Sequence, residues 1–465
     1  MTSHVADPVP TVTQPPTHGS LRLSELLGAL SCALDMTEGQ PAGHSMRCCW
    51  IGMHVGREIG LDEKALWELY YTLLLKDLGC SSNAAKVADF YGADDLAFKR
   101  TFKTIGPKLT DSIEFLLGNA AQGLTAIDRA RALVHVFRNA GRFSRELIET
   151  RCHRGADIAR RLRFSEAVAQ GVRHLDEHWD GGGHPEGLRG ESISLYARIA
   201  LLAQAVDVFH SEGGRAAALR EARRRAGVWF DPRLVEALEG VTRIEAFWNG
   251  LTSPTLAEAL MALEPARRRL PLDEDWLDDI ATGFGEVIDA KSPYTSGHSA
   301  RVAAYADALG EALGVEPGRR RWLRRAALLH DVGKLGVSST ILDKPGQLAS
   351  DEWVAMKAHA DKTHQVLSRI GAFDEMARVS AAHHEKLDGT GYPLGLRDAQ
   401  ISLETRIITA CDFLDALTAD RPYRAAMPVA RALDIMRGEL GRGVDPQVFA
   451  ALEQLVATRP DLMAA

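Results

Sequence analysis

Histidines and aspartates gather in the second half of this 465-residue chain in a pattern that can bind metal ions. The pattern contains two doublets, and its other members stand alone in segments with helical periodicity. The set comprises His298, the doublet His330–Asp331, His359, the doublet His383–His384, and Asp412. Neutral imidazole and carboxylate groups are suitable ligands for Fe, Mn, Zn and similar divalent ions. Any single histidine is more simply a surface or core residue, but the whole set predicts a metal centre.

The first doublet stands where a predicted helix runs into the sequence GKLG. Adjacent residues point about 100° apart on a helix, so both side chains can line one cavity from the helix end. Asp331 can then bridge two ions while His330 binds one of them.

Helical periodicity dominates the chain from Leu21 onward. Apolar residues recur at three- and four-residue steps over 298–313, and Gly314 and Pro317 then end that helix. Residues 319–329 predict a second helix, and 255–263 a short one. Strand signals are scarce, so the sequence predicts an all-α fold.

The chain also repeats itself. The block AGHSMRCCWIGMHVGREIGL from Ala42 aligns with SGHSARVAAYADALGEALGV from Ser296, and LLKDLGCS aligns with LLHDVGKL at the same shift. A later block, DGGGHPEGLRGESISLYARI from Asp180, aligns with DGTGYPLGLRDAQISLETRI from Asp388 at a shorter shift, so one copy has extra residues. We predict two tandem helical-bundle domains of one fold. The predicted parts are a disordered leader at 1–20, domains at 21–248 and 276–465, and a linker at 249–275.

The second copy resembles the HD-GYP domain of the HD superfamily of metal-dependent phosphohydrolases, and the first resembles a degenerate HD-type repeat. The family's motifs occur in order over 280–455, as GHSARV, LLHDVGKLG, ILDKPGQL, EWVAMKAHA, HHEKLDGTGYPLGL and ACDFLDALTADRPYR. The resemblance implies a helical bundle that binds two divalent ions, most often Fe or Mn, through the seven residues above. It also implies a bacterial signal-transduction hydrolase that cleaves cyclic di-GMP. Two ions about 4 Å apart can activate a bridging hydroxide for this reaction.

The resemblance further assigns residues to catalysis and to the substrate. Asp331 and Lys334 are expected to be catalytic. The expected substrate contacts are Lys334, Gly391, Tyr392, Pro393, Arg421 and Arg424. Lysine and arginine can neutralise the charge that phosphodiester oxygens gain in the transition state. Each assignment has a structural alternative. Lys334 could be a cation at a helix end, the loop DGTGYPLG a structural turn, and Arg421 and Arg424 members of surface salt bridges.

One position departs from the family pattern. Some members have a glutamate four residues before the first histidine, which helps to hold a third metal, and this chain has Tyr294 there. We therefore expect two ions, and leave open whether hydrolysis stops at the linear dinucleotide or proceeds to the mononucleotide.

The first copy lacks most of the ligands. His44 remains, but Lys76 replaces His330 and brings a like charge to a cation site. The other replacements are Cys80 for Lys334, Leu175 and Asp176 for His383 and His384, and Gln204 for Asp412. We predict a structural or regulatory domain that packs on the second copy, dimerises or senses a signal. A metal site rebuilt from His153, His174, His178 and His184 is the less favoured alternative.

Composition and sequence patterns argue against several classes of function. The formal net charge of −7 argues against a nucleic-acid polymer bound on a broad basic face. The six cysteines form no CxxC pair, which favours reduced thiols. The N-terminus has no signal-peptide pattern, and no apolar stretch is long enough to span a bilayer. We expect a cytoplasmic protein with no membrane partner.

Other functions stay open at this point. HD-type sites also cleave other nucleotides, and related di-iron bundles oxidise small molecules. A non-catalytic signalling scaffold, in a homodimer or with a signalling-protein partner, comes from a different class. The retention of every core ligand position in the second copy favours the phosphodiesterase.

Overall fold

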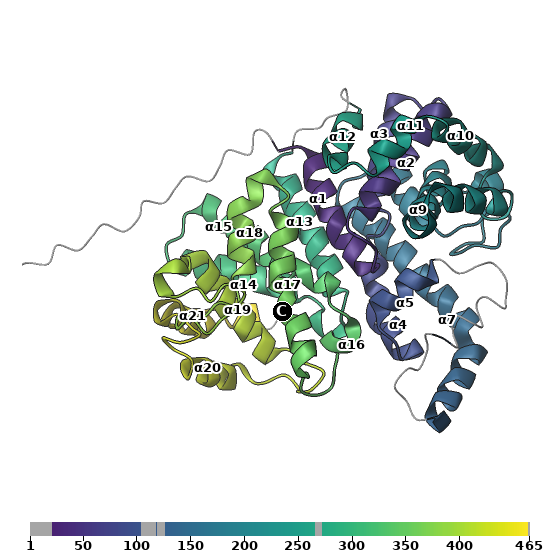
Figure 1. Ribbon diagram of the computed structural model, residues 1–465. Helices are drawn as coiled ribbons and strands as arrows, with labels where there is room; N and C mark the ends of the chain where they lie inside the picture. Colours follow the sequence, from purple (N-terminus) through teal and green to yellow (C-terminus); the bar gives the residue numbers. More distant parts are fainter. Residues whose placement is uncertain (1–20, 104–117, 119–125, 266–271, 464–465) are drawn as a thin grey trace, which may run out of the picture.

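The computed structural model describes residues 21–103, 118, 126–265 and 272–463, and shows helices arranged in two lobes (Figure 1). The only β structure among these residues is a set of isolated bridges, so the prediction of an all-α fold is confirmed. None of the described helices is both long and apolar enough to cross a membrane. The predicted leader at 1–20 lies outside the described residues.

Ten helices of the described chain belong to the first half. They are α1 (Leu23–Thr37), α2 (His44–Glu58), α3 (Glu63–Leu75), α4 (Ala84–Tyr91), α5 (Asp95–Phe102), α7 (Ala126–Arg161), α8 (Glu166–Arg173), α9 (Leu195–Arg225), α10 (Pro232–Thr242) and α11 (Glu245–Leu251). The long helix α9 bends at Gly214, where φ is +71°.

The elements of the second half repeat much of this order. They are α13 (Glu274–Asp289), α14 (His298–Ala312), α15 (Pro317–Leu329), the 3-10 turn η5 (Val332–Gly336), α16 (Ser339–Leu342), α17 (Ser350–Leu367), α18 (Asp374–Ala381), α19 (Leu403–Thr418), α20 (Val429–Arg437) and α21 (Pro446–Thr458). Helix α14 thus matches its predicted range, and α15 begins two residues before its predicted start.

The predicted linker at 249–275 contains a further helix, α12 (Leu256–Leu263). It packs on α1 and α2. Beyond its end, the carboxylate of Glu264 accepts hydrogen bonds from Ser24 (2.8 Å) and Tyr71 (2.5 Å). Residues 266–271 lie outside the described residues. The part of the segment before them is therefore attached to the first half, and the domain bounds stay a proposal.

The two halves repeat each other in detail. Helices α1, α2, α3, α8 and α10 correspond to α13, α14, α15, α18 and α21, and the start of α9 corresponds to α19. The same cap begins α2 and α14: Asp35 accepts from Ser45 N (2.8 Å), and Asp289 accepts from Ser299 N (3.1 Å). The first half has extra helices, α4 and α5, between the two repeated blocks.

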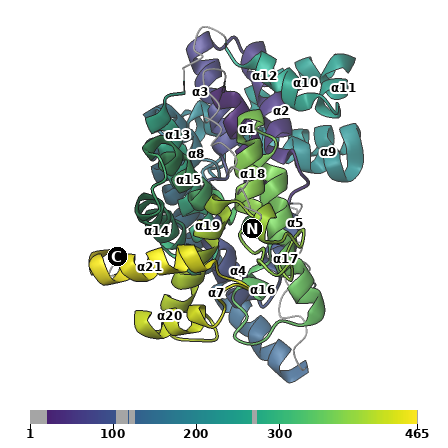
Figure 2. The ribbon, with the colours of Figure 1, turned by 90° about the vertical axis from the view of Figure 1, so that its left-hand side faces the viewer.

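The lobes share one hydrophobic core. Helix α1 packs against α17 and η5 of the second half and lies between the lobes in Figure 1; in Figure 2 it appears beside α18. Elsewhere on the boundary between the lobes, Trp276 of α13 donates through Nε1 to the carbonyl of Leu162 in the first half (2.8 Å). Burial of apolar surface across this boundary favours a fixed arrangement of the two halves.

A buried ion pair also crosses the boundary. Lys291, which is 1% exposed, donates to Asp95 at the start of α5 (2.6 Å). Asp95 also accepts from the backbone N–H of Ser339 (2.7 Å). Burial lowers the pKa of Lys291, and Asp95 opposes that shift. The extra helix α5 is therefore tied to residues beside the metal centre.

Neutralising Asp95 should destabilise the protein because it leaves the Lys291 ammonium buried without a counter-charge. We expect Asp95→Asn to lower the free energy of unfolding by about 3 kcal/mol, measured from the urea midpoint. The apolar pair Asp95→Leu with Lys291→Met should recover most of the loss. A change within about 0.5 kcal/mol for Asp95→Asn would contradict this account.

Candidate metal centre

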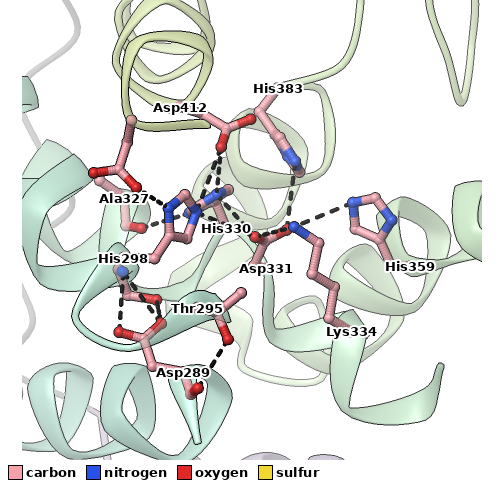
Figure 3. Close-up of polar contacts among 12 residues, drawn as sticks. Asp289, Thr295, His298, Ala327, His330, Asp331, Lys334, His359, His383 and Asp412 are labelled. Atoms are coloured by element: carbon pink, nitrogen blue, oxygen red, sulfur yellow. Dashed lines mark hydrogen bonds and ion pairs between the residues drawn. The ribbon is translucent and has the colours of Figure 1, made fainter. Parts of the chain in front are cut away.

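The carboxylate of Asp331 lies in the middle of the predicted ligands (Figure 3). Its Oδ2 is 3.3 Å from Nε2 of His330 and 3.5 Å from Nε2 of His298. Its Oδ1 is 3.6 Å from Nε2 of both His359 and His383. The two oxygens of one carboxylate thus face two separate pairs of imidazoles.

The surrounding ligands form two groups. His298, His330 and Asp412 have potential ligand atoms within 4.8 Å of one another, and so do His359, His383 and His384. Asp412 Oδ1 is 3.4 Å from His298 Nε2. The structure therefore brings all seven predicted ligands together, with Asp331 between the groups. This is the arrangement that a carboxylate bridging two cations requires.

Each buried ligand histidine is held by its other ring nitrogen. Nδ1 of His330, His359 and His383 donates to the carbonyl three residues earlier, at 2.6 to 2.7 Å. Nδ1 of His298 contacts Asp415 Oδ2 at 2.7 Å. These hydrogen bonds fix the tautomer and turn the Nε2 lone pairs inward, as outer partners of metal-binding histidines do.

Asp415 is a functional residue that the sequence analysis missed. It is 1% exposed, and it also pairs with Arg301 Nε (2.6 Å) one turn along α14. The repeat contains the same pattern, because Asp207 contacts both His44 Nδ1 and Arg47 Nε at 2.7 Å. Comparison of the two copies beyond the quoted motifs could have identified this pair.

A close backbone contact sets the distance between Asp331 and His359. A Cβ added at Gly333 would lie 2.0 Å from the carbonyl oxygen of His359, so only glycine fits there. Thr363 Oγ1 accepts from Gly333 N and donates to His330 O, both at 3.0 Å. Turn η5 and helix α17 are thereby joined next to the ligands.

Burial controls the protonation of the second group. It lowers the pKa of His359 to about 4 and that of His383 to about 3, and it holds the pKa of His384 well below its usual range. Burial opposes the charged form of His298 too, but the nearby carboxylates of Asp331, Asp415 and Asp412 raise its pKa to about 9. Burial also opposes ionisation of Asp331, but His330 and Lys334 hold its pKa well below its usual range.

These residues fit a pair of divalent cations. Nε2 of His298, His330, His359 and His383 and Oδ1 of Asp331 are buried without hydrogen-bond partners. Buried polar atoms are rarely left unpaired, because desolvation without a partner is costly. Here the unpaired atoms face one another, and their chemistry is that of ligands for Fe, Mn or Zn.

A hollow of about 740 Å³ opens over the ligands. Of the predicted substrate contacts, Lys334, Tyr392 and Arg421 line it. Gly391 and Pro393 are not among its lining residues, and Arg424 donates to the carbonyls of Ala416 and Leu417 near the end of α19. Four lining residues were not predicted from the sequence: the aromatic walls Trp353 and Tyr423, and the cations Lys291 and Lys344.

The corresponding position in the first half already contains cations. The Lys76 ammonium contacts the Asp77 carboxylate and lies 3.2 Å from Nε2 of His44. Arg151, which the repeat places opposite His359, pairs with Asp176, and Glu38 pairs with Lys103 (2.8 Å). Burial opposes ionisation of Asp77, but the neighbouring Lys76 lowers its pKa to about 2. Two buried groups there, His44–Cys48–Asp207 and Glu38–Asp77–Cys80, still have ligand-type atoms within 4.8 Å of one another, but Lys76, Arg47 and Lys103 pair with their carboxylates, so the loss of metal binding stays a prediction.

Comparisons with known proteins agree with this geometry. A family model for the HD domain matches residues 131–234 and 284–448. A 3'3'-cGAMP-specific phosphodiesterase of Vibrio cholerae is 53% identical over 439 residues, which cover 94% of this chain and 95% of that protein. A cyclic di-GMP phosphodiesterase of Pseudomonas aeruginosa is 39% identical over 37% of this chain and 42% of its own length.

A solved structure extends the likeness to three dimensions. A crystal structure of a cyclic GMP-AMP-specific phosphodiesterase from V. cholerae has a TM-score of 0.66 and 48% sequence identity. The match covers 95% of this chain and 99% of that one. The similarity therefore includes the first half as well as the metal centre.

Removing the central carboxylate charge should remove the metal. We expect Asp331→Asn to reduce the bound metal of the purified chain from about two ions to less than one, measured by plasma mass spectrometry. The matched change in the first half, Asp77→Asn, should leave the metal content unchanged. Full metal content in folded Asp331→Asn protein would exclude this residue as the bridge.

Proposed function

Because this chain belongs to the HD-GYP proteins of the HD-domain family, we propose that its second half hydrolyses a 3'3'-linked cyclic dinucleotide. The observation that carries the proposal is the Asp331 carboxylate, which lies between two groups of buried ligands under a large hollow. This is where a phosphodiester can meet two cations at once.

We favour 3'3'-cGAMP as the preferred substrate. The family resemblance of the sequence implied cyclic di-GMP as the substrate. Relatives named for cyclic di-GMP align with less than half of this chain. Of three relatives named for 3'3'-cGAMP, one aligns over 94% of it and the other two over 49% and 40%. Agreement over both domains, including the degenerate one, supports the mixed dinucleotide over cyclic di-GMP.

The metal ligands imply two ions, and we propose Fe or Mn in both positions. One ion would be held by His298, His330 and Asp412, the other by His359, His383 and His384, with Asp331 shared. When bound, such ions activate water as a nucleophile and neutralise charge on the phosphate. The side chain of Tyr294, a poor ligand, supports two ions over three.

The chain's own cations would act on the phosphate. The Lys334 ammonium contacts Asp331 and faces the hollow, so it can neutralise charge on a non-bridging phosphate oxygen. Arg421 lines the same hollow. Arg424 would act indirectly: its hydrogen bonds to backbone carbonyls hold the RPYR turn that presents Arg421.

The aromatic walls would bind the two bases. Trp353 and Tyr423 line the hollow and remain 47% and 66% exposed, which leaves their faces open for stacking. Tyr392 packs beside His384, with ring centroids 4.8 Å apart, and stiffens the wall next to the second ligand group. A volume of about 740 Å³ lies within the range of pockets for drug-sized ligands.

The substrate can be tested with a panel. The full chain loaded with Mn or Fe should hydrolyse 3'3'-cGAMP with a kcat/KM roughly tenfold or more above that for cyclic di-GMP, measured by chromatography of the products. A preference for cyclic di-GMP would reverse the substrate assignment. Turnover of other nucleotides alone would favour a different HD-type phosphohydrolase. No hydrolysis by the metal-loaded chain would favour a scaffold.

The stacking role can be tested separately from the metal. We expect Trp353→Ala to lower kcat/KM roughly tenfold, mainly through KM, because it removes one base-stacking face. Metal content should not change. The matched control is Val354→Ala, which alters an exposed neighbour outside the hollow lining and should behave like the wild type. An unchanged KM in Trp353→Ala would remove Trp353 from the substrate site.

A further inference from the structure

A second hollow lies in the first half, where the repeat would place the metal centre. Its volume is about 310 Å³, and helices α5, α7 and α9 and the loop DGGGHP contribute to its lining. Several counterparts of the active-site residues line it. They are Cys80, Arg151, Asp176 and Gln204, in the positions of Lys334, His359, His384 and Asp412. The loss of metal ligands has therefore not filled the cavity.

The charge of this hollow is positive. Four cations, Lys99, Lys103, Arg151 and Arg225, line it with two carboxylates, Glu38 and Asp176. Carboxylates neutralise part of that charge, since Glu38 pairs with Lys99 and Lys103 and Asp176 pairs with Arg151. Arg225 pairs with Glu221, which is not among the lining residues, so four cations face three carboxylates. The excess of positive charge suits an anion such as a phosphate.

Aromatic rings form the walls. His178 stacks on Trp229 with centroids 4.3 Å apart, and Tyr91 stacks on Phe98 at 4.1 Å. All four residues line the hollow. The Arg225 guanidinium also lies over Trp229, 3.8 Å from its centroid, so a nucleobase would pack on the neighbouring rings and not on the indole face.

One buried polar atom points to a ligand with hydrogen-bond donors. Gln204 is 9% exposed and lines the hollow, and its Oε1 is buried without a hydrogen-bond partner. Leaving such a group unpaired is costly, and an N–H or O–H group of a ligand would satisfy it. A nucleobase amine or a ribose hydroxyl would supply such a donor.

From these observations we propose that the first half binds one nucleoside monophosphate in this hollow. Its volume is less than half of the 740 Å³ over the metal centre, which suits one nucleotide unit where the larger hollow takes two. This size comparison rests on the proposed function; the charge, the rings and Gln204 do not. Helix α5 contributes Lys99 to this hollow and Asp95 to the pair with Lys291 in the active-site wall.

The test is calorimetric titration of the full chain with GMP and AMP. It is done on the Asp331→Asn background, so that binding at the metal centre does not contribute. We expect one nucleotide bound per chain, with guanosine and inorganic phosphate each binding at least roughly tenfold more weakly. Adding Trp229→Leu should weaken GMP binding roughly tenfold, because the indole holds the ring of His178 and the guanidinium of Arg225 in the wall of the hollow.

Arg151→Gln should also weaken GMP binding, and the matched control Arg138→Gln, an exposed arginine on the same helix α7, should not. If Arg151→Gln fails to fold, Trp229→Leu decides alone. No binding up to about 1 mM nucleotide, equal binding of phosphate alone, or wild-type affinity in Trp229→Leu would overturn the proposal. Failure of the proposed enzymatic function appears separately, as absent turnover by the wild type.

Discussion

The contact between one carboxylate and four imidazoles is the constraint on which the rest of this structure depends. Asp331 can face His298 and His330 on one side and His359 and His383 on the other only if four separate segments meet within a few ångströms. Burying these polar groups is costly without partners. The surrounding helices supply the apolar packing that offsets this cost and hold each ring by its outer nitrogen.

The two halves show how the same framework can support different chemistry. In the second half the space between Asp331 and its histidines suits divalent cations. In the first half the ammonium of Lys76 contacts Asp77 and lies beside His44. The cap of the first histidine and the pairing of Asp207 with Arg47 persist. A side-chain cation thus lies where the repeat would place a bound ion, and the fold is retained.

Much of the fold and of the metal-ligand set could be predicted from the sequence because both follow from local sequence patterns. Helical periodicity and the repeated blocks predicted the fold, and the motif order predicted the ligand set that the structure brings together. Asp415, Trp353 and the pair of Asp95 with Lys291 were missed because their roles arise from contacts between distant segments. Arg424 was expected to contact phosphate, yet its guanidinium is held by backbone carbonyls, which a motif alone does not reveal.

Lys76 in place of a metal ligand makes the folding stability of the two halves depend on different cations. A cation that binds the folded state adds to its stability in proportion to the logarithm of its free concentration. The second half would therefore gain or lose stability with the supply of transition metal. The first half contains a cation covalently, as Lys76, and would not depend on that supply in the same way. Metal starvation would remove stabilising interactions from the second half, and the first half would be affected only through the core that the two lobes share.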